Sequence, residues 1–217
     1  MMGCRIVVLI SGGGSNLQSI IDAAQAQQLG GGDVVAVISN KADAGGLQRA
    51  ERAGIATNCL PHTDFSSREA FDAALQETID QHRPDLVILA GFMRILTGGF
   101  VRHYLGRLLN IHPSLLPKYP GLNTHQRALD AGDREAGATV HFVTEELDGG
   151  PAIIQAKIPI NAGDDAATLA NKVLSKEHQI YPLAARWFAE GRLSLVASKA
   201  VLDEQELPQH GVIFNEH

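Results

Sequence analysis

Ile6-Val7-Val8-Leu9-Ile10, followed at once by Ser11-Gly12-Gly13-Gly14-Ser15-Asn16, sets the architecture of this chain. The first run is continuously apolar and rich in β-branched residues, which is typical of a strand buried on both faces of a parallel sheet. From Leu17 onward apolar residues recur at helical spacing, so the glycines occupy a strand-to-helix turn with Ser15 as the expected N-cap.

Such a turn exposes free backbone N–H groups at the positive end of a helix, and glycine lets a phosphate come close. The sequence is not a P-loop, because it lacks the Gly-Lys-Ser/Thr ending, and it is not a full GxGxxG fingerprint. A purely structural tight turn therefore stays open beside phosphate binding.

Strand-like and helix-like patterns alternate through the first half of the chain. Apolar strands are predicted at 34–38, 55–60 and 86–90, with helices at 47–52 and after the capping-box pattern Ser66-Ser67-Arg68-Glu69. This alternation predicts an α/β fold with an open, mostly parallel twisted sheet and helices on both faces. Ligands in such sheets bind beyond the carboxyl ends of the strands, where the glycine turn, Gly91–Leu96 and the loop after His112 would lie.

In the second half of the chain, the sequence pattern predicts a change of strand direction. Strands at 139–143 and 152–160 flank an acidic turn too short for a crossover helix, so they are expected to be antiparallel. A long helix capped by Asp164 or Asp165 follows, and Pro182 is expected to end or kink it. A hairpin at 193–202 and a weakly ordered polar tail at about 204–217 complete a single domain, 1–217.

Asn110-Ile-His-Pro-Ser-Leu-Leu-Pro117 places two chemically useful side chains where a short strand ends. Residues two apart in a strand point to the same face, so Asn110 and His112 should project side by side. An amide donor beside an imidazole can stabilise an oxyanion while the imidazole moves protons. A histidine satisfied at a strand end, followed by an ordinary proline loop, is the alternative interpretation.

The composition of the chain disfavours several classes of protein. The formal charge of −6 among 217 residues argues against a general binder of nucleic acid or of membrane surfaces. Two cysteines without a CxxC motif favour a reducing cytoplasm. No run approaches the roughly 18 apolar residues of a membrane span, and the N-terminus does not resemble a signal peptide.

Five motifs in order give the chain a recognisable resemblance. They are Ser11-Gly-Gly-Gly-Ser-Asn16, Gly91-Phe-Met-Arg-Ile-Leu96, Asn110-Ile-His-Pro-Ser-Leu-Leu-Pro117, His141-Phe-Val143 and Leu147-Asp-Gly-Gly150. Together they resemble the folate-dependent glycinamide ribonucleotide formyltransferases of purine synthesis, over about residues 5–190.

The resemblance implies a Rossmann-like formyltransferase fold and direct formyl transfer from 10-formyltetrahydrofolate to the amine of glycinamide ribonucleotide, without a metal or a covalent enzyme intermediate. It implies catalytic roles for Asn110, His112 and Asp148, with Asp148 favouring a protonated imidazole. The ribonucleotide would be held by Gly14, Ser15, Asn16 and Glu177. The folate would be held by Arg68, Met93, Arg94, Ile95, Leu96, Asn110, His141, Thr144, Glu145, Glu146, Leu147 and Asp148.

Some alternatives remain at this stage. A formyltetrahydrofolate hydrolase would use water as the acceptor, and a nucleotide-binding regulator would keep the fold without turnover. A nicotinamide enzyme is disfavoured because no complete dinucleotide fingerprint follows Ile10. Asp148 alone would be read as a turn residue, and Lys176 as a solvated helix lysine. The expected assembly is a monomer or a homodimer.

Overall fold

The computed structural model describes residues 3–215 and contains an eight-stranded sheet covered by helices. In the order in which they pair, the strands are β11 (Val212–Phe214), β7 (Ala152–Pro159), β6 (Glu135–Phe142), β5 (Leu108–His112), β4 (Leu86–Leu89), β1 (Cys4–Ile10), β2 (Gly32–Ser39) and β3 (Ala56–Cys59). Strand β6 runs antiparallel to both of its neighbours, and the other pairings are parallel. The predicted mostly parallel sheet is confirmed.

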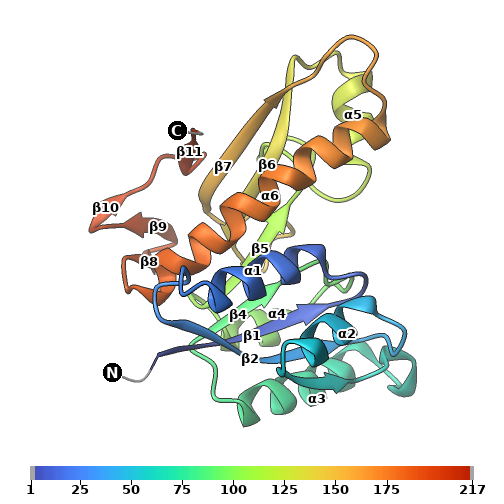
Figure 1. Ribbon diagram of the computed structural model, residues 1–217, viewed down its shortest axis with the longest axis vertical. Coiled ribbons are helices and arrows are strands. Elements are labelled where there is room, and N and C mark those ends of the chain that lie inside the picture. Colours follow the sequence, from blue (N-terminus) through green and yellow to red (C-terminus); the bar gives the residue numbers. More distant parts are fainter. Residues whose placement is uncertain (1–2, 216–217) are drawn as a thin grey trace.

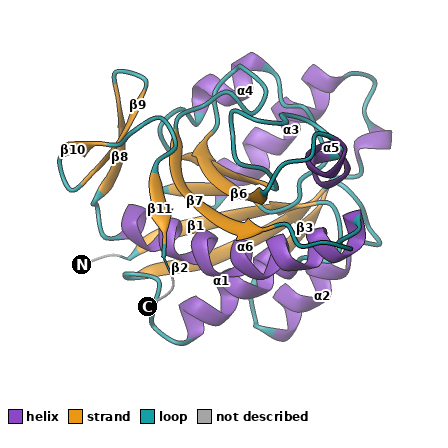
Figure 2. Ribbon diagram, turned by 90° about the horizontal axis from the view of Figure 1, so that it is seen from above, coloured by secondary structure: helices purple, strands orange, loops and turns teal. Residues whose placement is uncertain are grey.

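Helices lie on both faces of this sheet (Figure 2). They are α1 (Ser15–Gln25), α2 (Gly45–Arg52), α3 (Arg68–Gln81), α4 (Gly98–His103), α5 (Thr124–Asp130) and α6 (Ala166–Ala189), with a short 3-10 turn at His62–Asp64. The long α6 crosses the sheet over β6 and β7, and α5 lies at the far end with the β6–β7 arm (Figure 1). None of the helices among residues 3–215 combines the length and apolarity needed to cross a membrane.

Strand β1 supplies both halves of the core because its side chains alternate between the two faces. Ile6, Val8 and Ile10 pack in one buried cluster with side chains of α1 and α6. Val7 and Leu9 pack in a second buried cluster with side chains of α3 and α4. A strand covered by helices on both faces must be apolar throughout, as the sequence predicts.

Two helix starts differ from the predicted ones. Gly14, in the left-handed conformation with φ 73°, occupies the N-cap of α1, and Ser15 is the first helical residue. The cap of α3 is Ser67, whose Oγ accepts from the N–H of Ala70 at 3.0 Å, so the pattern starts one residue later than the Ser66 capping box implies. Asp165 caps α6 by accepting a hydrogen bond from the N–H of Thr168. It is one of the two residues, Asp164 and Asp165, that the sequence predicted as the cap.

The C-terminal region also departs from expectation. Pro182 lies inside α6, which continues to Ala189, so the prediction that this proline could end the helix is wrong. The expected hairpin forms as β8 (Leu193–Val196) and β9 (Lys199–Leu202), and β10 (Gln205–Glu206) extends it. Where a polar tail was expected, Val212–Phe214 pairs with β7 as the edge strand of the main sheet.

Candidate active site

The end of β5 places Asn110 and His112 on one face of the sheet. In the antiparallel register with β6, Asn110 lies opposite His141 and His112 lies opposite Thr139. The Nδ2 atom of Asn110 is 3.4 Å from Nε2 of His141. The period-two spacing that predicted neighbouring side chains is therefore confirmed, and β6 adds a second histidine to the pair.

Asp148 joins this group from the acidic turn after β6. Its backbone is left-handed, with φ 51°, and its side chain is 8% exposed. Its Oδ2 lies 3.5 Å from Nδ1 of His112 and accepts a hydrogen bond from the N–H of Gly121 at 2.9 Å. Its Oδ1 is 3.9 Å from Nε2 of His141, too far for a hydrogen bond. The turn thus carries the carboxylate into contact with both histidines.

Two acceptor groups flank the imidazole ring of His112. Its Nε2 lies 2.8 Å from the carbonyl oxygen of Tyr119, which can only accept, so Nε2 donates. Its Nδ1 faces the carboxylate of Asp148, and an ionised carboxylate also only accepts. The carbonyl of Tyr119 and the carboxylate of Asp148 therefore flank the ring of His112, one at each nitrogen.

His141 has the opposite arrangement. Its Nδ1 donates to the carbonyl oxygen of Phe142 at 2.9 Å, which leaves Nε2 to accept from Asn110. Desolvation by burial lowers the pKa of His141, and this effect outweighs the opposing influences of Phe142 and Asp148. A neutral His141 therefore orients the Asn110 amide.

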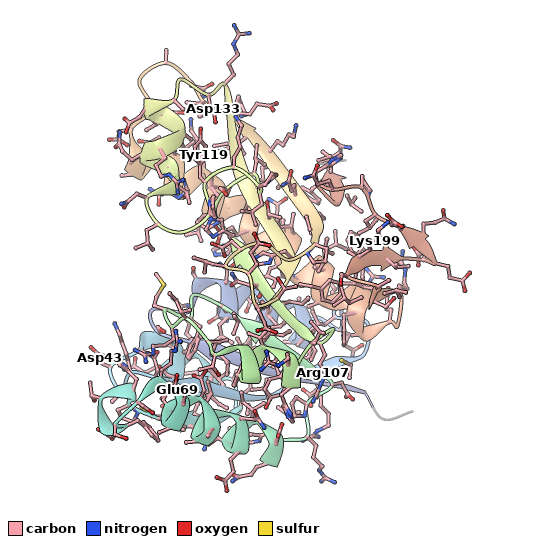
Figure 3. The ribbon with its side chains drawn as sticks, turned by 180° about the vertical axis from the view of Figure 1, so that it is seen from behind. Asp43, Glu69, Arg107, Tyr119, Asp133 and Lys199 are labelled. Atoms are coloured by element: carbon pink, nitrogen blue, oxygen red, sulfur yellow. The ribbon has the colours of Figure 1, made fainter. Side chains whose placement is uncertain are left out.

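Buried polar contacts fix the loop that leaves β5. The hydroxyl of Thr139 donates to the carbonyl oxygen of Ser114 at 2.7 Å and accepts from the N–H of Leu116 at 3.1 Å. Farther along, Tyr119 has φ 56° and its hydroxyl donates to Asp133 at 2.9 Å; the two residues lie close together in Figure 3. Because Tyr119 is anchored in this way, its carbonyl is held against His112.

The glycine turn borders open space on one side. A methyl group added to Gly12 or Gly13 would meet no atom within 4 Å, and both residues are exposed. The hydrogen-bond ladder of α1 begins with the N–H of Gln18 bonded to the carbonyl of Gly14, so the preceding N–H groups of the first turn have no intrahelical partner. These features suit the approach of an anion.

Asn16 and Glu177 meet at this turn although 161 residues separate them. The Nδ2 of Asn16 donates to Oε2 of Glu177 at 2.7 Å. Burial raises the pKa of Glu177, and the bond from Asn16 opposes that rise. Among the described residues, the buried Oδ1 of Asn16 has no hydrogen-bond partner, so a ligand donor would satisfy it.

Tyr181, one helical turn beyond Glu177, links the glycine turn to β5. Its buried hydroxyl lies 2.8 Å from the carbonyl oxygen of Leu89 and 3.0 Å from that of Leu109, the residue before Asn110. The two groups of expected site residues are therefore joined through α6.

The expected folate residues present apolar side chains to solvent. Met93 is 69% exposed, Ile95 63% and Leu147 58%. An apolar ligand would cover such side chains favourably. The N–H of Met93 donates to the hydroxyl of Ser11 at 2.8 Å, which ties this segment to the glycine turn.

The other expected folate residues are more dispersed. Arg94 lies over the ring of Phe71, 5.3 Å from its centroid, and its buried Nε has no partner among the described residues. Glu145 is paired with Arg102 of α4 at 2.7 Å. Arg68 and Glu146 are exposed, whereas Leu96 and Thr144 are half-buried.

Other neighbours of the expected site were missed by sequence reasoning. Tyr119 and Gly121 contact His112 and Asp148 through backbone atoms, which leave no side-chain signal in a sequence. Arg49 of α2 donates to the carbonyl oxygen of Gly13 at 2.7 Å, a contact between segments that only the folded sheet brings together.

A pocket of about 350 Å³ borders Asp148 on the side of the C-terminal hairpin. Its walls come from Leu116 and Pro117, from Gly149 to Ala152, and from residues 198–200 and 206–209. It does not include the glycine turn or the exposed apolar side chains. No cluster of three or more His, Cys, Asp or Glu side chains suited to a metal ion occurs within residues 3–215.

Comparisons with known proteins all identify formyltransferases or purine biosynthetic proteins as similar to this chain. The family described as formyl transferase matches residues 4–185. Phosphoribosylglycinamide formyltransferase of Escherichia coli K12 is 59% identical over 212 residues, which is 98% of this chain and 100% of that protein. The trifunctional purine biosynthetic protein adenosine-3 of Drosophila melanogaster is 51% identical over 188 residues, covering 86% of this chain and 14% of that protein.

A solved structure agrees with the fold. The phosphoribosylglycinamide formyltransferase of Coxiella burnetii superposes with a TM-score of 0.94 at 52% identity, covering 98% of this chain and 100% of that one. The family match over most of the chain, the identity to curated relatives and the shared fold lead to one conclusion: this chain belongs to the formyl transferase family.

Proposed function

We propose that this chain is a phosphoribosylglycinamide formyltransferase, which moves the formyl group of 10-formyltetrahydrofolate to the amine of glycinamide ribonucleotide in purine biosynthesis. The family and the names of the close relatives support this activity. The observation that carries it at the site is the contact of His112 with Asp148 beside Asn110, at the end of a central strand. A binding module has no need of such a trio.

The reaction joins the amine nitrogen to the formyl carbon and breaks the bond between that carbon and N10 of the folate. Attack by the neutral amine creates a tetrahedral oxyanion and a cationic nitrogen; a proton then leaves this nitrogen, and N10 gains one as it departs. Asn110 and His112 supply the donors for the oxyanion. Asp148 stabilises the imidazolium and takes part in the proton relay.

His112 must exchange a partner to act on the oxyanion. In the structure its Nε2 donates to the carbonyl of Tyr119. We infer that the bound formyl group competes with this carbonyl for Nε2. Asp148 remains against Nδ1 during the exchange, so the positive charge keeps its counter-ion.

The two substrates would enter from adjoining segments. The N–H groups of Gly14 and Ser15 would receive the ribonucleotide phosphate, while Asn16 and Glu177 would bind its polar groups. The folate would cover the exposed apolar side chains of the 93–96 segment and of the 144–148 turn. Arg68, at the first residue of α3, would add a positive charge at the edge of that surface.

The whole chain would act as one cytoplasmic formyltransferase domain, 1–217, without a metal. A formyltetrahydrofolate hydrolase and a nucleotide-binding regulator are the competing functions. A spectroscopic assay of tetrahydrofolate formation, with each substrate omitted in turn, separates the three. Turnover that requires both substrates supports the formyltransferase. Formyl loss without the ribonucleotide would identify a hydrolase, and no turnover with either mixture would identify a regulator.

A further inference from the structure

Helix α2 holds two carbonyl groups of the glycine turn, those of Gly12 and Gly13. The N–H of Gly46 donates to the carbonyl oxygen of Gly12 at 3.0 Å. The Nε of Arg49 donates to the carbonyl oxygen of Gly13 at 2.7 Å. A charged donor makes the second bond the stronger one. The turn is thus fastened to α2 by one backbone bond and one arginine.

Helix α2 packs so closely on the turn that no side chain fits at Gly14. A methyl group on Gly14 would lie 2.7 Å from Cα of Gly46 and 3.5 Å from Cδ of Arg49. The guanidinium is also held on its other side, because Nη1 lies 3.3 Å from Oε1 of Gln18 on α1. Arg49 therefore bridges the turn and the first turns of α1.

These contacts fix the direction of two N–H groups. In a trans peptide the C=O and the following N–H lie in one plane and point in opposite directions. When the carbonyls of Gly12 and Gly13 point at α2, the N–H groups of Gly13 and Gly14 point away from it. The turn is open at these residues, because a methyl group added to Gly12 or Gly13 would meet no atom within 4 Å.

We propose that Arg49 is a positioning residue for the ribonucleotide: it holds the Gly13–Gly14 peptide with its N–H toward the phosphate and adds positive charge behind the turn. This inference rests on the proposed phosphate site and names a side chain that completes it. The unpartnered Oδ1 of Asn16, in the same turn, independently indicates that a polar ligand belongs there. Arg49 also faces His178 of α6, and burial together with this arginine lowers the pKa of that imidazole.

The test compares two substitutions of Arg49 with one of Arg52, an exposed arginine on the same helix. Arg49→Gln removes the charge, and Arg49→Lys keeps the charge but not the planar donor group. Arg49→Gln should raise KM for the ribonucleotide about tenfold or more, as expected for a lost charged hydrogen bond. The folate KM and kcat at saturation should stay near wild type. Arg49→Lys should recover part of the loss, and Arg52→Gln should change neither KM.

The same assays distinguish failure of this proposal from failure of the phosphate site itself. Gly13→Ala adds a methyl where the protein has room, so it obstructs only a ligand. If Gly13→Ala raises the ribonucleotide KM while Arg49→Gln leaves it unchanged, the site stands and the role of Arg49 is wrong. If neither variant raises it, both proposals fail. Parallel increases in both KM values with a lowered Tm would show that Arg49 only maintains the fold, which also overturns its positioning role.

Discussion

Nδ1 of His112 lies 3.5 Å from Oδ2 of Asp148, and both side chains are 8% exposed. A carboxylate removed from water in this way stabilises a neighbouring imidazolium more strongly than one at the surface. The Gly121 N–H bonded to the same oxygen keeps the carboxylate in place. This pair is the part of the site that a conservative substitution can test most directly.

Asp148→Asn should lower kcat by about 100-fold or more, the usual contribution of a positioned proton-transfer group. Asparagine tolerates the left-handed backbone found at this position, and its amide oxygen can still accept from Gly121. The loss should therefore arise from the missing charge and not from unfolding. Steady-state kinetics should show the fall in kcat with both KM values changed much less.

Asp130→Asn is the matched control, because Asp130 is an exposed aspartate of α5 outside both expected substrate sites. It should retain kcat within about twofold, since an exposed charge contributes little. Near-normal kcat in Asp148→Asn would return that residue to the status of a turn former.

Gly13→Ala should raise the ribonucleotide KM about tenfold or more and leave the folate KM unchanged. The added methyl meets no protein atom within 4 Å, so only a ligand approaching the turn would meet it. Gly14 would be a poor choice, because its φ of 73° and the nearby Gly46 would make any side chain there disrupt the fold. Gly99→Ala, which also points into open space, serves as the control, and equal ribonucleotide KM values in the two variants would contradict a phosphate site at the turn.

Sequence periodicity was sufficient to predict the framework of this molecule. The continuous apolar run of β1 requires helices on both faces, and the period-two spacing of Asn110 and His112 requires that they share a face. Those inferences depend only on local geometry. The contact of Asp148 with His112 was instead expected from family resemblance, because an Asp-Gly pair by itself indicates only a turn.

The features that the sequence could not predict depend on contacts with residues far away in the chain. Val212–Phe214 is too short to be recognised alone and becomes a strand by pairing with β7. Pro182 would normally end a helix, but Tyr181 and Ala184 on either side of it are fully buried, and that packing offsets the lost hydrogen bond. Arg49 has the pattern of a solvated helix arginine, and only the fold brings it to Gly13.

Arg94 provides a test of how the folate segment binds. Its guanidinium packs over the ring of Phe71, so Arg94→Ala should lower stability by about 1 kcal/mol through the lost cation–π contact. If the backbone of this segment makes the pterin contacts, the folate KM should change less than about tenfold, because the substitution keeps the main-chain N–H and C=O groups. Thermal unfolding and kinetics of Arg94→Ala and Arg94→Met separate packing from charge. A hundredfold weaker folate KM in both variants would show that the guanidinium itself binds the ligand.

Glu177 should make the stability of the protein depend on pH. Burial raises its pKa above the ordinary value of 4.5, so the folded state holds the proton more tightly than the unfolded chain does. The contribution of Glu177 to the free energy of unfolding should therefore be largest below that ordinary value and should decrease as the pH rises through the raised folded pKa. Above that pKa the buried carboxylate is ionised, with Asn16 as its donor, and the penalty is complete.

Glu177→Gln removes the titrating group while keeping an oxygen that can accept from Asn16. We expect its free energy of unfolding, relative to wild type, to increase as the pH rises from the ordinary value of 4.5 through the raised folded pKa, while its ribonucleotide KM rises because the carboxylate is lost. Urea unfolding at several pH values measures the first effect, and kinetics at the same pH values measure the second. Glu190→Gln is a suitable control, since Arg186 and Arg192 lower the pKa of that glutamate, so its difference from wild type should stay constant above the ordinary value of 4.5 and change only below it. A difference between Glu177→Gln and wild type that stays constant across this range would show that burial does not perturb Glu177, and the link between its desolvation and ligand binding would fail.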